Sequence, residues 1–171
     1  MITKFEFSKP EIAESAYVAP TAVVIGRACI SERASVWFQS VVRADINEIR
    51  IGADSNVQDS CTLHVTQEYP VIIGERVTIG HGAIVHGCTI ESDCLIAMGA
   101  IILDGVVIGR NSLVAAGAVV APRTIVPPES MVMGVPAKVI RKLSEKEQEN
   151  MQENWRHYVE YAERYKKAKI I

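Results

Sequence analysis

Aliphatic residues recur at every sixth position along most of this chain. They form three runs, at positions 18–42, 51–63 and 84–132, in which each sixth residue is Val, Ile or Leu. Ile72 extends the third run upstream, and Thr78 is its one member that is not aliphatic. A helix returns to the same face after about 3.6 residues and a strand after two. The period of six therefore predicts short strands separated by corners, with the aliphatic side chains pointing inward.

The residue two positions before each aliphatic one is usually small. Cys61, Cys88 and Cys94 occupy this small position, so we interpret them as packing residues rather than ligands. Cys29 lies outside it, and the sequence assigns it no role. A hexapeptide period indicates a parallel β-helix, in which each coil covers the apolar face of its neighbour. The pattern resembles that of left-handed β-helices of triangular section, so we predict an all-β solenoid of that hand over residues 1–140.

The regular spacing is interrupted twice. Steps of nine residues separate Val42 from Ile51 and Leu63 from Ile72, and polar residues occupy both intervals. Extra residues in a solenoid loop out on one face, which is often the binding face. We therefore expect functional side chains in these two intervals.

The hexad pattern ends among the prolines at positions 127–136. Ser144 and Glu147 then have the spacing of a capping box that opens a helix. An apolar stripe follows at steps of three and four residues: Met151, Trp155, Tyr158, Ala162 and Tyr165. We predict an amphipathic helix within residues 141–171 that packs on the flank of the β-helix or on a neighbouring subunit.

Composition narrows the classes of function. The 171 residues carry a formal net charge of −2 and contain no stretch apolar enough to span a bilayer. These features give no reason to expect a nucleic acid or a membrane as a partner. An acidic residue, Glu6, lies where a signal peptide needs its apolar run, so we expect a cytoplasmic protein with reduced cysteines.

Three of the four histidines form a candidate metal site. Three imidazoles are the ligand set of one kind of catalytic zinc site, with a fourth position left open for water. The alternative is that each is an ordinary solvent-facing or hydrogen-bonded histidine. His64, His81 and His86 occupy different places in the hexad, so they need not converge within one prism. We therefore hypothesise that a metal ion lies between protomers; His157, on the predicted helix, is left out of the set.

Several polar segments resemble the motifs of the gamma-class carbonic anhydrase family in order, spacing and setting. The matching segments are Arg43-Ala44-Asp45, Asn56-Val57-Gln58-Asp59, His64, and His81 with His86. The resemblance implies a homotrimer with three metal sites at its subunit interfaces. It also implies that one chain supplies His64 and His86 and that its neighbour supplies His81. The implied metal is Zn2+, and Fe2+ or Co2+ would also suit imidazole ligands.

The same resemblance implies a set of candidate catalytic residues. Arg43 would pair with Asp59 across the interface and Asp45 would join them, because a partly buried charge there needs a partner. Gln58 would hydrogen-bond the reacting water or bicarbonate. Glu68, the one acid of the second interval, is either a proton relay or a solvated loop carboxylate.

One departure from the family pattern concerns proton release. The best-known members have an acidic residue where this chain has Ile46, and they have a longer acidic loop after the first histidine. Loss of those acids would slow proton release without abolishing zinc binding.

The sequence thus predicts an enzyme that reversibly hydrates carbon dioxide to bicarbonate, a carbonate dehydratase. Two alternatives stay open. A hexapeptide acyltransferase using coenzyme A would share the fold and need a single histidine as general base. A non-catalytic, metal-binding trimeric scaffold would use the same site only to lock its interface.

Overall fold

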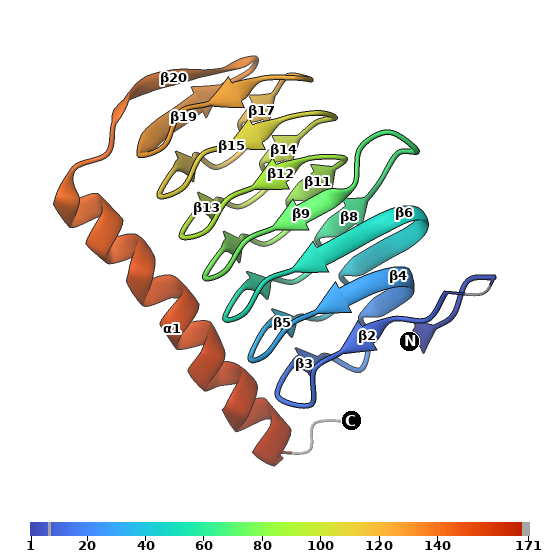
Figure 1. Ribbon diagram of the computed structural model, residues 1–171. Helices are drawn as coiled ribbons and strands as arrows, with labels where there is room; N and C mark the ends of the chain where they lie inside the picture. The colour runs from blue at the N-terminus through green and yellow to red at the C-terminus, as the bar shows by residue number, and fades with distance from the viewer. Residues whose placement is uncertain (7, 169–171) are drawn as a thin grey trace.

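The computed structural model describes residues 1–6 and 8–168. The chain forms a β-solenoid of about 7 turns of hexapeptide repeats followed by one C-terminal helix, which confirms the predicted fold class (Figure 1). The strands in chain order are β1 (Ile2–Thr3), β2 (Glu11–Ile12), β3 (Tyr17–Val18), β4 (Val23–Ile30), β5 (Ser35–Val36), β6 (Val41–Ile51), β7 (Asn56–Val57), β8 (Thr62–His64), β9 (Val71–Ile73), β10 (Thr78–Ile79), β11 (Ile84–His86), β12 (Thr89–Ile90), β13 (Leu95–Ile96), β14 (Ile101–Ile102), β15 (Val107–Ile108), β16 (Leu113–Val114), β17 (Val119–Val120), β18 (Ile125–Val126), β19 (Ser130–Gly134) and β20 (Ala137–Lys142). The helix is α1 (Glu145–Ala168).

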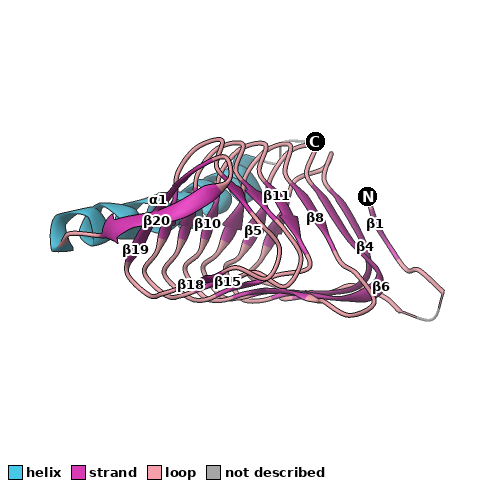
Figure 2. Ribbon diagram, turned by 90° about the horizontal axis from the view of Figure 1, so that it is seen from above, coloured by secondary structure: helices cyan, strands magenta, loops and turns pink. Residues whose placement is uncertain are grey.

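The strands stack into three faces. The β7 face runs in the order β3-β5-β7-β10-β13-β16-β19 and ends with the antiparallel strand β20. A second sheet bends around a corner, because the first half of β6 pairs with β8 and its second half pairs with β9. This sheet supplies the β8 face, with β11, β14 and β17, and the β9 face, with β12, β15 and β18 (Figure 2).

Aliphatic side chains from successive strands fill the interior. The predicted inward register is confirmed from position 24 to position 63 and again from Ile90 to Val132, where the aliphatic residues of the series are buried. Val18 is only half-buried, whereas Tyr17 and Ala19 on either side of it are buried. Each strand therefore contributes apolar area to one continuous core, which the neighbouring coils help to cover.

Between residues 72 and 84 the predicted register is wrong by one position. Ile84 is exposed over 38% of its surface, and Ile72 is half-buried. The interior residues of this stretch are instead Ile73, Ile79 and Val85. The series returns to phase after Gly87, because the positive-φ corners at Gly82 and Gly87 are five residues apart, whereas the next corner, at Asp93, follows after the usual six.

The three cysteines of the small position are buried, as predicted. Burial raises the pKa of the Cys61 thiol to about 11 and that of Cys94 to about 12. Burial also raises the pKa of Cys88. All three thiols therefore stay protonated near neutral pH and act as small apolar packing groups.

The two interruptions of the repeat project from one corner of the solenoid (Figure 1). In the first, β6 continues without a break around the corner; in the second, residues 65–70 form the loop between β8 and β9. This corner separates the β8 face from the β9 face, so both insertions lie beside the residues that end β8 and β11.

The helix α1 begins with the predicted capping box. The Ser144 backbone N–H donates to Glu147 Oε2 at 2.9 Å, and the Glu147 N–H donates to the Ser144 hydroxyl at 3.4 Å. The helix packs across β3, β5 and β7 of the same chain (Figure 1). Trp37 meets the rings of Tyr158 and Tyr165 edge-on, with centroids 5.3 Å and 5.0 Å away. Within residues 1–6 and 8–168, no helix has the length and apolar character needed to cross a membrane.

The observed register predicts a contrast between two isoleucines. Ile79 is fully buried, whereas Ile125 is exposed over 66% of its surface. We expect Ile79→Ala to lower the free energy of unfolding by about 2–5 kcal/mol and Ile125→Ala, which removes the same atoms, to lower it by less than about 1 kcal/mol. Denaturant midpoints compared at one protein concentration measure both, and equal losses would contradict this register.

Candidate metal centre

The parallel ladder of the β8 face places four side chains in one row. Ile25 pairs with Arg43, Arg43 with His64, and His64 with His86 in adjacent strands. Each row member follows an interior residue, and successive side chains of a strand point to opposite sides. The row therefore faces outward, and it ends in the two histidines beside the inserted loops.

The two histidines of this row face each other. His64 Nδ1 lies 3.0 Å from His86 Nε2. The other nitrogen of each ring meets a carboxylate: His64 Nε2 lies 3.1 Å from Asp45 Oδ1, and His86 Nδ1 lies 2.5 Å from Asp104 Oδ1. A carboxylate accepts an N–H, so in the neutral rings the two facing nitrogens both carry lone pairs. Two lone pairs this close repel unless a proton or a metal cation lies between them.

The burial of His64 favours the neutral form of its ring, which is the form that binds a metal. Burial lowers the pKa of His64 and so favours the neutral imidazole. Burial is also the largest influence on Asp45 and would raise its pKa. Hydrogen bonds from Arg43 and His64 together outweigh it and hold the pKa of Asp45 below its ordinary range. Asp45 thus stays ionised between the Arg43 guanidinium and the His64 ring.

His81 lies at a different corner, in the turn after β10. Its Nδ1 is 2.8 Å from Asp59 Oδ2, and its Nε2 is 3.4 Å from the Tyr158 hydroxyl on α1. Across residues 1–6 and 8–168, no group of three or more His, Cys, Asp or Glu side chains is placed to hold a metal ion. One chain therefore brings together His64 and His86 but not His81.

Gln58 and Asp59 accompany His81 rather than the histidine pair. The His81 backbone N–H donates to Gln58 Oε1 at 3.2 Å. The Gln58 amide donates in turn to Asn56 Oδ1 at 3.2 Å. Asp59 contacts His81 in this chain, so a pairing of Asp59 with Arg43 stays a prediction about two subunits. The candidate residues thus divide into two groups at two corners.

Glu68 lies in the loop over the histidine pair. This loop lines an open groove together with His64, His86, Tyr69 and Asp104. Glu68 raises the pKa of the Tyr69 hydroxyl by hydrogen bonding to it. Its position fits a proton relay and a solvated loop carboxylate equally well, so both interpretations stay open.

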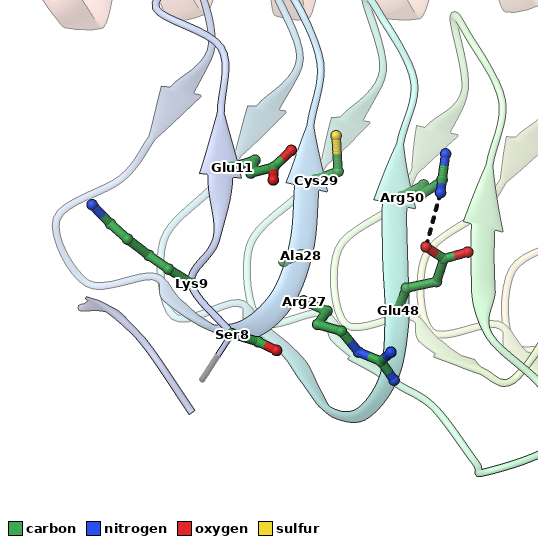
Figure 3. Close-up of a pocket in the computed structure, with 8 residues that line it drawn as sticks. All are labelled: Ser8, Lys9, Glu11, Arg27, Ala28, Cys29, Glu48 and Arg50. Atoms are coloured by element: carbon green, nitrogen blue, oxygen red, sulfur yellow. Dashed lines mark hydrogen bonds and ion pairs between the residues drawn. The ribbon is translucent and has the colours of Figure 1, made fainter. Parts of the chain in front are cut away.

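A second groove lies at the start of the solenoid and contains no histidine (Figure 3). Cys29 of β4 stands there between Glu11 of β2 and Arg50 of β6, and Arg50 is paired with Glu48 at 3.0 Å. The groove is therefore separate from both groups of candidate residues.

Sequence reasoning missed two residues of these groups. Asp104 contacts His86 from the next coil, and Tyr158 reaches His81 from the helix, where it was assigned only to packing. The signal for Asp104 is its distance of one coil from His86. The shortened repeat places residue 103 opposite His86 and Asp104 opposite Gly87, so the contact does not follow from the hexad spacing alone.

Known proteins that are similar to this chain include hexapeptide-repeat transferases and carbonic anhydrases. Residues 87–122 match a family model described as "Bacterial transferase hexapeptide (six repeats)". A Methanocaldococcus jannaschii protein named "Probable carbonic anhydrase" is 51% identical over 152 residues, which cover 89% of this chain and 96% of that protein. A Geobacillus kaustophilus protein named "Carbonic anhydrase" is 41% identical over 166 residues, covering 97% and 91%. The crystal structure of a hexapeptide transferase family protein from Anaplasma phagocytophilum matches with a TM-score of 0.92 at 32% identity, covering 96% and 97%.

The lowered pKa of Asp45 predicts a dependence of stability on pH. The folded chain holds this carboxyl ionised at a pH where the unfolded chain, with an ordinary pKa near 3.8, already binds a proton. We expect the metal-free protein to lose stability as the pH falls below about 4, and Asp45→Asn to make that loss less steep. Urea midpoints at a series of pH values measure this loss of stability. If the midpoint fell as steeply with pH in Asp45→Asn as in the wild type, Asp45 would contribute nothing to the pH dependence.

Proposed function

This chain belongs to the gamma-class carbonic anhydrase-like family of hexapeptide-repeat proteins, and we propose that it hydrates carbon dioxide reversibly to bicarbonate at a metal ion held between subunits. The observation that carries the proposal is the pair of facing imidazole nitrogens, 3.0 Å apart, with a carboxylate on the far side of each ring. Metal-ligating histidines characteristically donate their other N–H to a carboxylate.

The donor set fits a divalent metal ion. His64 and His86 present two neutral nitrogens that lie 3.0 Å apart. Two nitrogen ligands of a tetrahedral zinc ion are expected to lie about 3.3 Å apart. Zn2+ is the proposed metal, with Fe2+ and Co2+ as alternatives that imidazole also suits. When bound, the metal supplies a Lewis acid that makes water nucleophilic at neutral pH. Asp45 and Asp104 hold the two rings in the orientation that this requires.

The third ligand is proposed to be His81 of a neighbouring subunit. The His81 side chain is 46% exposed, and Asp59 on Nδ1 leaves Nε2 as the nitrogen that carries the lone pair, with the Tyr158 hydroxyl 3.4 Å away. The outward row beside the histidine pair is apolar except at Thr62: Val23, Val41, Ile84, Ile101 and Val119. Such a row suits a subunit contact. Packing this face on the corner that bears His81 would repeat around a closed homotrimer.

Each subunit would then supply half of two sites. One half would contain Arg43, Asp45, His64 and His86, and the other would contain Gln58, Asp59 and His81. Arg43 and Asp59 are half-exposed in the single chain, and across this interface they would form the ion pair that the buried contact requires. Gln58 would orient carbon dioxide or bicarbonate from the His81 side, since its carbonyl oxygen already lies beside that residue.

Acyl transfer from coenzyme A is the second candidate. It is favoured by the transferase description of the matching repeat model and by the name of the structural relative from Anaplasma phagocytophilum. An acyltransferase needs one histidine as general base, whereas here two histidines face each other and each is backed by a carboxylate. Hydration is therefore the better-supported function, and turnover of an acyl-coenzyme A would favour the alternative.

Replacing His86 tests the proposed hydratase activity. We expect the protein purified without oxygen to contain Zn2+ or Fe2+ and to hydrate carbon dioxide in a stopped-flow assay. His86→Ala should lose at least about 100-fold in kcat/KM, because a ligand of the metal is removed. His157→Ala, which alters an exposed histidine on α1, is the matched control and should keep wild-type activity.

Two results would contradict the proposal. One is a His86→Ala variant with wild-type hydration. The other is a metal-loaded trimer with no rate above buffer, which would indicate the non-catalytic scaffold.

A further inference from the structure

We propose that Asp104 is the positioning residue that holds His86 ready to bind the metal, an inference that rests on the metal site of the proposed function. The Asp104 carboxylate oxygen Oδ1 lies 2.5 Å from His86 Nδ1, on the side of the ring away from His64. By accepting a hydrogen bond from the Nδ1–H group, it fixes the tautomer of His86 whose lone pair is on Nε2. That nitrogen is the one that faces His64.

The backbone makes room for this contact at Gly87. Asp104 follows β14, one coil beyond His86, and its carboxylate lies directly over Gly87. A Cβ atom at residue 87 would lie 2.8 Å from Asp104 Oδ1 and 3.0 Å from Tyr69 Cβ. Only glycine leaves both neighbours in place, and the φ of 50° there also favours glycine.

Neighbouring groups hold Asp104 in position on both sides. The Gly105 N–H donates to the Gly87 carbonyl at 2.7 Å, and the Arg123 N–H donates to the Asp104 carbonyl at 2.8 Å. The Tyr69 ring covers Gly105, where a Cβ atom would lie 3.2 Å from two ring carbons. These two hydrogen bonds and the Tyr69 ring therefore fix the backbone that carries the Asp104 carboxylate.

Asp104 differs from the carboxylate on His64. Asp45 shares its charge with Arg43, whereas the Asp104 carboxylate has no Lys or Arg nitrogen within 4.0 Å in residues 1–6 and 8–168. Among these residues its one ion-pair partner is therefore the His86 ring. A more basic imidazole is a stronger ligand, so Asp104 should increase metal affinity as well as fix the geometry.

Metal affinity measured by competition with a coloured chelator tests this role. For Asp104→Ala we expect affinity for Zn2+ to fall about 10- to 100-fold, with circular dichroism and oligomeric state unchanged because Asp104 is half-exposed. Asp104→Asn keeps an oxygen that can accept the Nδ1 proton, so it should lose less. The d–d absorption of the Co2+ protein should shift in Asp104→Ala, which a purely structural role would not cause. Glu153→Gln, on the exposed side of α1, is the charge-matched control and should leave affinity unchanged.

A second variant tests the same contact without removing the charge. Gly87→Ala should also weaken Zn2+ binding, because the new methyl group displaces the Asp104 carboxylate. The two effects should not add: in the Asp104→Ala background, Gly87→Ala should weaken binding no further.

Wild-type Zn2+ affinity in both Asp104→Ala and Asp104→Asn would overturn this proposal while leaving the proposed function intact. Full additivity of Asp104→Ala and Gly87→Ala would also overturn it. Failure of the unaltered protein to bind Zn2+, Fe2+ or Co2+ would instead overturn the proposed function, and this inference with it.

Discussion

The hydrogen-bonded pairing of β8 with β11 is the interaction on which the candidate centre depends. Parallel strands in a sheet lie about 4.8 Å apart, so a residue and its partner one coil later have adjacent side chains. His64 and His86 are such partners, and their rings have centroids 5.0 Å apart. No long-range packing of loops is needed to bring them together. The buried residues Leu63 and Val85, directly before them, hold both strands to the core and turn both rings outward.

The same stacking explains how carboxylates reach the histidines. Asp45 comes from the coil before His64, and Asp104 comes from the coil after His86. His81 has its own carboxylate, Asp59, in the coil before it. Each of the three candidate ligands therefore has one nitrogen on an aspartate and one directed elsewhere. The same arrangement of histidine and aspartate thus occurs at two corners that lie apart in one chain. This is the arrangement expected if both corners contribute ligands to the proposed metal site.

The fold could be predicted because the hexad signal is repeated many times, so one irregular repeat does not hide it. The register between residues 72 and 84 could not be predicted, because Ile72 and Ile73 are both aliphatic and the sequence does not distinguish which of them points inward. The histidines could be singled out by their chemistry and their family motif. Asp104 could not, because the pairing of the two coils places it opposite Gly87, and its carboxylate reaches His86 across a residue that has no side chain.

The central claim is that a site combines His64 and His86 of one subunit with His81 of the next, and mixing two inactive variants tests it most directly. His81→Ala and His86→Ala are unfolded and refolded together in equal amounts, and metal-dependent hydration is measured. In a randomly mixed trimer about one quarter of the interfaces join an intact His64–His86 pair to an intact His81. The account predicts recovery of about one quarter of wild-type activity, and no recovery when His64→Ala is mixed with His86→Ala. Absence of recovery in the first mixture, or equal recovery in both, would contradict it.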